Sequence, residues 1–426
     1  MQKLRTIKGT HDILPWESHK WQKIESVLRE VFAAYAYKEV RTPVFEYTAL
    51  FARGVGEFSD IVSKEMYTFE DKGGESLTLR PELTASVARS FIQHNYQQEA
   101  PLHKLWYLGP LFRQERPQAG RQRQFHQFGI EVIGSPHPEA DAEVIELACR
   151  VYRALGLRNW ELHINSIGSI EARKNYMDIL RAALEPHKDG LCDTCRERFH
   201  GNILRLFDCK NPECGRIMKA HAPAILDHLS PEDTEHFNAL RNYLDAVGIP
   251  YVIDPALVRG LDYYTRTTFE IKGTALGAQD ALCGGGRYDL LIRDLDGPDT
   301  PAVGFAAGME RLILAMDAEG LFEQESDGLD LYIAPMDSRC LEKVLPLVTA
   351  LREKGYRVQL ELLRRSVKAM LRDANRQQVQ WVAVVGEQEL EKRSMNLKNL
   401  RENDQLETAW DEIGAVLDRT SKRKPI

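Results

Sequence analysis

A dense group of arginines lies in the segment FRQERPQAGRQRQFHQFGIEV. Arg113, Arg116, Arg121 and Arg123 fall within eleven positions of the chain. Planar guanidinium groups bind phosphate oxygens in a forked, bidentate manner that lysine cannot copy. We therefore predict that this segment binds a phosphate group or an RNA backbone. An exposed charged loop is the alternative interpretation of the same residues.

The stretch that follows these arginines alternates between polar and apolar side chains. Gln127, Gly129 and Glu131 share one face of a predicted strand, whereas Phe128 and Ile130 lie on the other face. A polar row with a central glycine can form the floor of a site for a small ligand. The solvent-facing side of an ordinary antiparallel sheet would show the same pattern, so both interpretations stay open.

Four of the seven cysteines lie close together in the sequence and raise the question of a metal site. Cys192 and Cys195 form a CxxC pair, which is followed by Cys209 and Cys214. This spacing approaches that of a zinc ribbon, but the second pair encloses four residues instead of two. An odd number of cysteines argues against a disulfide framework and favours a reducing compartment. Buried thiols packed inside the protein are the simpler account, and structural zinc is the alternative.

The arginine segment needs a rigid support, and the surrounding pattern predicts one. HKLWYLGPLFRQE and QFHQFGIEVI are typical of two strands joined by the polar loop RPQAGRQR. Apolar residues from Trp21 to Tyr35 recur at helical spacing, and EVRTPVFEYTALF suits an edge strand because Pro43 cannot donate to a ladder. The segment LTLRPELTASVARSFIQH turns from a strand into a helix, with Thr84 as a suitable N-cap.

The chain is long enough for more than one domain, and its pattern changes twice. Residues from about 170 to 247 are typical of a helical, charged insertion, after which strand-like segments resume. AEGLFEQESDG resembles a linker, and strand, helix and strand alternate beyond it, as in a mainly parallel sheet. We therefore expect one domain over residues 1–325, including the insertion, and a second domain over residues 328–426.

The bulk composition limits the classes of protein that fit. Of the 426 residues, 43% are hydrophobic and 28% are charged, which is the balance of a globular protein. A net charge of −7 argues against a protein that coats nucleic acid, although it leaves room for local basic patches. No apolar run approaches the roughly 18 residues of a membrane-spanning helix, and the start of the chain does not resemble a signal peptide. We expect a cytoplasmic protein without a membrane partner.

Five segments together resemble the motifs of a known enzyme family. YLGPLFRQERPQAGRQRQFHQFGIEV resembles motif 2 of class II aminoacyl-tRNA synthetases, in the form found in histidyl-tRNA synthetases, and AVGFAAGMERLIL resembles motif 3. The Trp21 helix with the Pro43 strand resembles motif 1. LVRGLDYYTRTTFEI and CGGGRYD resemble the two histidine-specific motifs. TLRPELTA also fits the family, although Leu83 stands where many bacterial members have glycine.

The resemblance implies both a fold and an activity. The fold would be an α+β catalytic domain on an antiparallel sheet of class II synthetase type, with a helical insertion, followed by an α/β anticodon-binding domain with a mainly parallel sheet. The chain would be a bacterial-type homodimer that uses L-histidine, ATP and tRNA(His), with Mg²⁺ assisting. It would form histidyl-adenylate and pyrophosphate and then load the 3′ end of the tRNA. A non-catalytic regulatory relative in histidine biosynthesis and a class II synthetase for another amino acid are the alternatives.

The resemblance also implies roles for individual residues. Arg113 and Arg259 would act as the catalytic pair, holding the α-phosphate of ATP from opposite sides. Arg116 and Arg123 would lie near the acceptor stem of the tRNA. The ATP site would comprise Arg113, Arg121, Glu115 and Arg311, and the histidine site Glu82, Leu83, Thr84, Arg113, Gln127, Glu131, Arg259, Tyr263, Tyr264 and Tyr288.

A second basic cluster lies in the tail and consists of Arg364, Arg365, Lys368, Arg372 and Arg376. It begins at the end of a predicted strand and follows a helix that Ser366 could cap. In the resembled family this domain reads the anticodon, and a basic helix beside a sheet edge suits contacts to an RNA backbone. A solvated helical face is an equally open interpretation for most of these side chains.

Overall fold

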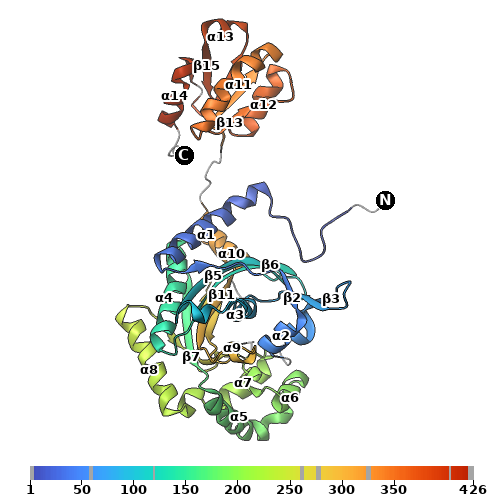
Figure 1. Cartoon of the computed structure of the whole chain (residues 1–426), viewed down its shortest axis with the longest axis vertical. Coiled ribbons are helices and arrows are strands. Elements are labelled where there is room, and N and C mark those ends of the chain that lie inside the picture. Colours follow the sequence, from blue (N-terminus) through green and yellow to red (C-terminus); the bar gives the residue numbers. More distant parts are fainter. Residues whose placement is uncertain are drawn as a thin grey trace. The chain divides into compact units, whose positions relative to one another are not determined.

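The computed structural model describes residues 4–56, 61–118, 120–259, 263–274, 280–322, 328–402 and 404–420 (Figure 1). The chain separates into two compact units, Met1–Phe322 and Glu323–Ile426, and each is described here by itself. The middle of the expected linker, residues 323–327, and both ends of the expected domains, 1–3 and 421–426, lie outside the described residues. So do residues 260–262 of the LVRGLDYYTRTTFEI segment.

A mixed sheet forms the centre of the first unit. Within the described ranges it has eight strands in the order β1-β5-β6-β11-β10-β9-β7-β8. The neighbours from β5 to β7 pair antiparallel, and only the outer pairs, β1 with β5 and β7 with β8, are parallel. The strands are β1 (Lys38–Glu39), β5 (His103–Phe112), β6 (Gln124–Ile133), β7 (Trp160–Ser166), β8 (Val252–Ile253), β9 (Thr265–Gly273), β10 (Ala281–Arg287) and β11 (Ala302–Gly308).

One face of this sheet carries the main hydrophobic core. Phe128, Phe269 and Phe305 project from three different strands into it, and each is at most 2% exposed. Helix α1 (Pro15–Ala34) adds Trp21, Ile24, Leu28, Val31 and Phe32, which confirms the predicted apolar stripe. The other helices that contribute to this core are α4 (Pro138–Ala154), α8 (Pro231–Ala246) and α10 (Met309–Ala318).

A buried ion pair anchors α4 to the sheet. The guanidinium of Arg287 on β10 donates to both carboxylate oxygens of Asp141, and both side chains are fully buried. Arg287 also donates to the carbonyl oxygens of Ser135 and His137 at 2.8 and 3.0 Å. Burial opposes the charge on Asp141, but Arg287 prevails and lowers the pKa of this carboxyl to about 2.

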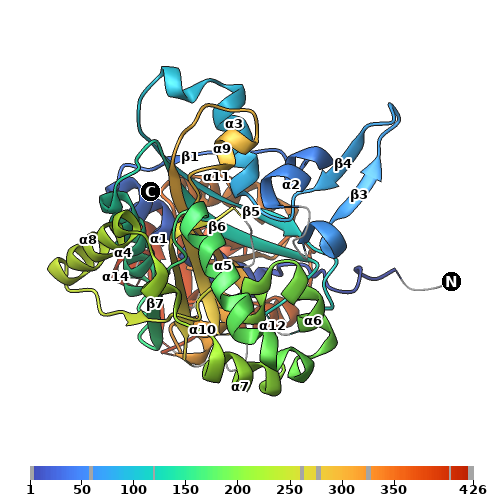
Figure 2. The same ribbon diagram turned by 90° about the horizontal axis from the view of Figure 1, so that it is seen from below.

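The opposite face of the sheet is covered more sparsely, which leaves room for a site. Helix α3 (Thr84–Gln93) and the short α9 (Leu291–Asp294) pack there with Tyr107 and Tyr288. Helix α2 (Thr48–Val55) packs on α3 through Phe51 and Ala85. A separate small sheet of β2 (Phe45–Tyr47), β4 (Ser76–Leu79) and β3 (Tyr67–Glu70) reaches away from the large one (Figure 2).

The structure corrects two details that the sequence suggested for this region. EVRTPVFEYTALF is not one edge strand, because β1 ends before Pro43, β2 belongs to the small sheet and α2 begins at Thr48. Thr84 is not the N-cap of α3. The carboxylate of Glu82 instead accepts from the backbone N–H groups of Thr84 and Ala85, both at 2.8 Å. The predicted pair of strands that carries the arginines is confirmed as β5 and β6.

The helical insertion follows β7 and gathers at one end of the unit (Figure 1). Its helices α5 (Ile170–Leu184), α6 (Asp193–His200) and α7 (Pro212–His221) surround a small core of their own, which includes Tyr176, Leu180 and Cys195. Helix α8 is different, because its buried residues Phe237, Leu240 and Leu244 belong to the main core. The helical stretch predicted from the sequence is therefore divided between two cores.

The second unit is an α/β fold on a mixed sheet of five described strands. Strand β12 (Leu331–Pro335) pairs in parallel with β13 (Val358–Leu360) and β14 (Trp381–Val385). Strands β15 (Ser394–Asn399) and β16 (Gln405–Ala409) are antiparallel, so less of the sheet is parallel than predicted. The short α13 between β14 and β15 explains this, because a parallel return needs a longer crossover. The helices are α11 (Ser338–Glu353), α12 (Val367–Arg376), α13 (Glu387–Lys392) and α14 (Ile413–Thr420).

The predicted fold class is thus confirmed in both units, with the sheets somewhat more mixed than expected. No helix among the described residues is long and apolar enough to cross a membrane.

Candidate active site

The sheet face opposite the main core is lined by glycines where three strands lie side by side. Gln127, Gly129 and Glu131 of β6 lie opposite Gly308, Ala306 and Gly304 of β11 in register, and Ala306 in turn lies opposite Gly284 of β10. Phe128 and Ile130 point into the main core, so the predicted alternation of β6 is confirmed. The small residues leave this face open for larger side chains and for a ligand.

Glu131 lies at the buried end of this floor, with 1% of its surface exposed. Its Oε1 accepts from the hydroxyls of Thr84 and Tyr107 at 2.8 and 3.0 Å, and its Oε2 accepts from the hydroxyl of Tyr288. Gly304 makes room for it, because a Cβ there would lie 1.9 Å from Oε2. Burial raises the pKa of Glu131 to about 8, against the lowering effect of the three hydroxyls.

Glu82 is a second buried carboxylate next to this group, with 4% of its surface exposed. It caps the start of α3, as described above. Thr84 links the two carboxylates, because its backbone N–H donates to Glu82 and its hydroxyl donates to Glu131. Burial raises the pKa of Glu82, while its two backbone donors and the nearby Arg113 act in the opposite direction. A carboxylate has about four lone-pair positions, so Glu82 can accept a further donor from a ligand.

Aromatic rings form a wall beside the two carboxylates. The ring of Tyr263 lies edge-on to Tyr288 with centroids 5.5 Å apart, and 4.7 Å from the ring of Tyr264. Leu83 is buried in the same cluster as Tyr107 and Tyr288. Tyr264 packs in the core of the insertion instead, so it joins the wall to that subdomain.

Arg113 follows β5 directly and is held at the edge of the floor. Its Nε donates to the carbonyl oxygen of Pro81 at 2.9 Å, and its guanidinium lies 5.3 Å from the centroid of the Phe125 ring. Glu115 lies 3.8 Å from Arg113 and 3.2 Å from Arg121, which places one carboxylate between the two arginines. These contacts orient Arg113 without neutralising it completely.

Arg259 approaches the same floor from the far side. Its Nη1 donates to Glu270 of β9 at 2.8 Å, and its Nη2 lies over Gly284, where a Cβ would stand only 1.9 Å away. Gly284 and Gly129 are separated by two strand spacings, about 10 Å. The guanidinium of Arg259 therefore lies over β10, on the far side of β11 from the polar row of β6.

Arg311 completes the group of arginines from the first turn of α10. It donates to the carbonyl oxygens of Gly120 and Ala281 at 3.1 and 2.8 Å, and so ties the arginine loop to β10. Burial and then the charge of Arg121 lower its pKa, and Arg113 contributes in the same direction. Like charges gathered in this way raise the energy of the free site, and a polyanion such as a nucleotide triphosphate relieves that repulsion.

The structure thus brings the predicted ATP and histidine residues to one face of one sheet. The two residues expected near the acceptor stem lie in the same loop, where Arg116 is exposed and Arg123 donates from Nε to the carbonyl oxygen of Glu115 at 3.4 Å. Sequence reasoning missed Tyr107, Glu270 and the reason for Gly284. Tyr107 lies in a largely apolar strand and Glu270 among the other polar residues of β9, and only the register shows what they face.

A largely antiparallel sheet, with its main core on one face and buried carboxylates beside an arginine-bearing loop on the other, more sparsely covered face, agrees with the class II aminoacyl-tRNA synthetase that the sequence motifs resemble. The family model "Histidyl-tRNA synthetase" matches residues 9–312, and the model "Anticodon binding domain" matches residues 330–420. The chain therefore belongs to the histidyl-tRNA synthetase family.

Comparison with known proteins agrees over nearly the whole chain. A histidine–tRNA ligase of Halothermothrix orenii is 49% identical, covering 94% of this chain and 95% of that protein. One from Lysinibacillus sphaericus is 47% identical, covering 97% and 99%. The solved apo histidyl-tRNA synthetase of Staphylococcus aureus superposes with a TM-score of 0.82 at 38% identity, covering 97% of this chain and 100% of that one.

The same comparisons separate the catalytic enzyme from its regulatory relative. A Bacillus halodurans structure described as an ATP phosphoribosyltransferase regulatory subunit/histidyl-tRNA synthetase is only 22% identical, with a TM-score of 0.62, and shows the fold alone. The closer relatives named above are ligases, and the match to an anticodon-binding domain is the feature of a protein that handles tRNA. This chain is an aminoacyl-tRNA synthetase and not the regulatory protein.

Proposed function

We propose that this chain activates L-histidine with ATP and transfers the histidyl group to the 3′ end of tRNA(His). The observation that carries the proposal is the grouping of two buried acids and two arginines on one sheet face. Glu82 and Glu131 are buried on this face, Arg113 lies near Glu82, and Arg259 lies over β10, two strands from Glu131. A histidine zwitterion bound between them would turn its ammonium and ring N–H toward the acids and its carboxylate toward the arginines.

In the activation step, an oxygen of the histidine carboxylate attacks the α-phosphorus of ATP. The bond to the bridging oxygen breaks, and its electron pair leaves with pyrophosphate. Arg113 and Arg259 would hold the α-phosphate from two sides and balance the charge that develops on its oxygens. Phosphoryl-transfer catalysis of this kind is mainly positioning and electrostatic stabilisation, so no nucleophile of the protein is needed.

Recognition of the amino acid would fall to the residues around Glu131. Its carboxylate would accept the ring N–H of histidine, and Glu82 would accept from the α-ammonium group, with Thr84 and Gln127 as further partners. Leu83, Tyr263, Tyr264 and Tyr288 would supply flat or apolar walls. An amino acid without the ring N–H would lose this hydrogen bond to a buried carboxylate, which is a basis for rejection.

The outer phosphates and the base of ATP would lie toward the loop. Arg121 would face the γ-phosphate, and Arg311 the adenine or the outer phosphates. Mg²⁺ in such sites is usually held by one or two carboxylates together with substrate phosphates. Glu115 would be the carboxylate for this role, because it lies beside Arg121 and so near the proposed place of the γ-phosphate. The ion would neutralise phosphate charge when bound.

The division of labour along the chain follows from the two units. We assign amino acid activation to residues 1–325, with the insertion at about 170–247, and anticodon binding to residues 328–426. Arg116 and Arg123 would contact the acceptor stem. We also propose a homodimer, which the exposed Phe45 and Tyr47 on β2 support as an apolar surface. The substrates are those of protein synthesis, which favours the cytoplasm.

The decisive experiment is ATP–pyrophosphate exchange with a panel of amino acids, followed by charging of tRNA(His). Only histidine should support exchange. Arg113→Ala and Arg259→Ala should each reduce the exchange rate on the order of 10²-fold or more, because they remove a charge partner of the transition state. Arg339→Ala is the matched control, since that side chain is 71% exposed in the second unit.

Exchange supported by an amino acid other than histidine would reject the specificity. Unchanged exchange in both arginine variants would reject the assigned catalytic pair. Circular dichroism of each variant separates these outcomes from a loss of folding.

A further inference from the structure

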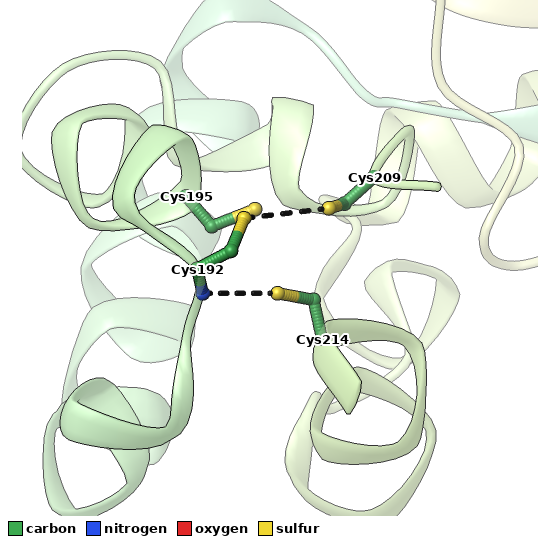
Figure 3. Close-up of side chains that lie close together, drawn as sticks. All are labelled: Cys192, Cys195, Cys209 and Cys214. Atoms are coloured by element: carbon green, nitrogen blue, oxygen red, sulfur yellow. Dashed lines mark hydrogen bonds between the residues drawn. The ribbon is translucent and has the colours of Figure 1, made fainter. Parts of the chain in front are cut away.

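Four cysteine side chains converge in the insertion, far from the arginine site in sequence. Cys192, Cys195, Cys209 and Cys214 turn their sulfur atoms toward one another (Figure 3), and all four sulfurs lie within 4.8 Å of each other. The Sγ atoms of Cys192 and Cys209 are 3.8 Å apart. Four sulfurs at the usual Zn–S distance of about 2.3 Å form a tetrahedron with edges of about 3.8 Å. The thiols are thus spaced for a metal ion and not for a disulfide, whose sulfurs lie about 2 Å apart.

The structure also removes the objection that the sequence raised. The second pair encloses four residues instead of two because a helix begins between its members. Asn211 caps α7 by accepting from the backbone N–H of Glu213 at 2.9 Å, and Cys214 follows in the first turn of that helix. Cys192 and Cys195 stand at the start of α6 in the same way. The extra residues form the turn that leads into α7, and the sulfurs of Cys209 and Cys214 both still reach the cluster.

Backbone N–H groups point at two of the four sulfur atoms of the cluster. The backbone N–H of Cys192 points at the sulfur of Cys214 at 3.3 Å, and that of Asn211 points at the sulfur of Cys209 at 3.4 Å. Such donors stabilise negative charge on sulfur, as do the starts of two helices. Cys195 and Cys214 are fully buried, whereas Cys192 and Cys209 are half-buried. The cluster is therefore closed by the protein interior on the side of Cys195 and Cys214, and an ion can enter from solvent on the side of Cys192 and Cys209.

We infer that Cys192, Cys195, Cys209 and Cys214 bind one structural Zn²⁺ ion. Four protein thiolates close the coordination sphere, and a site without an open position is structural and not catalytic. Binding releases the thiol protons, so that Zn²⁺ and four thiols give a tetrathiolate complex of charge −2 and four protons. A tetrahedral S₄ set also accepts iron, and the metal analysis below distinguishes the two.

A metal ion has a clear structural task in this subdomain. The core around Tyr176, Leu180 and Phe199 is small, and cores of this size commonly need a metal or a disulfide to hold them together. The ion would join the start of α6 to the start of α7. Helix α6 in turn supplies Glu197 to the lining of a cavity of about 530 Å³, to which Arg259 also contributes. The ion would thus steady the wall that faces the catalytic arginine.

The test is metal analysis of the full chain, purified without chelator from cells grown with added zinc. We expect about one equivalent of zinc per chain and little iron, and release of that zinc when a mercurial reagent titrates the thiols. The double variant Cys192→Ala/Cys209→Ala should hold less than about a fifth of an equivalent. These two side chains are half-buried, so their loss leaves no large void. Cys340→Ala in the second unit is the matched control and should keep its zinc.

The wild-type protein decides the question even if the double variant fails to fold. Cobalt exchanged into it should give thiolate-to-metal charge-transfer absorption, which a non-specific surface site would not. Less than a tenth of an equivalent of zinc, both as isolated and after incubation with the ion, would overturn the inference. Iron in place of zinc, disulfides among the four cysteines, or full zinc retention in the double variant would overturn it as well. None of these readouts depends on synthetase activity.

Discussion

Arg259 lies across Gly284, and a side chain at residue 284 would displace it. A Cβ atom there would stand 1.9 Å from Nη2 of Arg259 and 2.3 Å from its Cζ. The same strand position lies opposite Glu270 in register, whose carboxylate accepts from Arg259 at 2.8 Å. Gly284 therefore lets the guanidinium of Arg259 lie close to the sheet, and Glu270 fixes its orientation. Arg259 is far from the other arginines in the sequence.

Gly284→Ala should remove the function of Arg259 without touching Arg259 itself. The atoms that would clash belong to the end of a flexible side chain, so the fold can accommodate the methyl group by moving the guanidinium away. We expect histidine-dependent exchange to fall on the order of 10²-fold, as for loss of a transition-state donor. Gly414→Ala is the control, because a Cβ there meets only ordinary contacts, the nearest at 3.4 Å. An exchange rate equal to that of the wild type would show that the position of Arg259 does not matter.

Glu131 should make the ligand-free protein less stable as the pH rises. Burial raises its pKa from 4.5 to about 8, so the folded chain keeps a proton that the unfolded chain has released. This contribution to stability is complete below pH about 4.5 and is lost as the pH rises through about 8. Differential scanning calorimetry across that window should show a steeper fall in Tm for the wild type than for Glu131→Gln, by about one proton in the linkage slope. Parallel curves would contradict the prediction.

The ion pair between Asp141 and Arg287 should dominate the attachment of α4. Asp141→Asn removes the fully buried carboxylate partner of Arg287 and leaves only the partly exposed Asp289 at 3.1 Å, and we expect a loss of about 3 to 5 kcal/mol in the free energy of unfolding. Asp317→Asn breaks an exposed pair with Lys20 and should cost less than about 1 kcal/mol. Urea unfolding near neutral pH measures both. Similar losses for the two variants would mean that burial of the Asp141–Arg287 pair does not increase its contribution to the free energy of unfolding.

The basic cluster of the second unit should separate into structural and RNA-binding members. Arg365 pairs with Glu361, which is 1% exposed on its side chain, and with Asp373 at 2.7 Å, so Arg365→Ala should lower the Tm of this unit. Lys368 and Arg372 are exposed. Lys368→Ala should leave histidine-dependent exchange unchanged, weaken charging of tRNA and reduce the slope of log kcat/KM against log salt by about 1. Charging with an unchanged salt slope would remove Lys368 from the RNA surface.

Patterns that depend on near neighbours could be predicted from the sequence. The stripe of α1, the alternation along β6 and the pair of strands around the arginine loop all follow from periodicities of three to four or two residues, and the structure confirms them. The length and order of the motifs also identified the family. The edge strand around Pro43 was wrong because a proline also marks the place where a chain leaves one sheet for another.

Relationships between distant segments required the tertiary structure. The meeting of Arg259 with Gly284, the three hydroxyls on Glu131 and the capping of α3 by Glu82 each depend on strand register or on a turn that no local pattern specifies. The cysteines show the same division. Their spacing only approached that of a zinc ribbon and left zinc as the alternative, whereas the sulfur positions argue for it.

The sequence by itself determined the arginine-bearing pair of strands, the arrangement of apolar faces and the family, because side-chain type and spacing along one element decide which face is buried. Only the tertiary structure decided what the polar groups of that open face contact. Carboxylates, guanidiniums and thiols act through distances of a few ångströms, and those distances are set by how separate strands and helices pack and not by their separation along the chain.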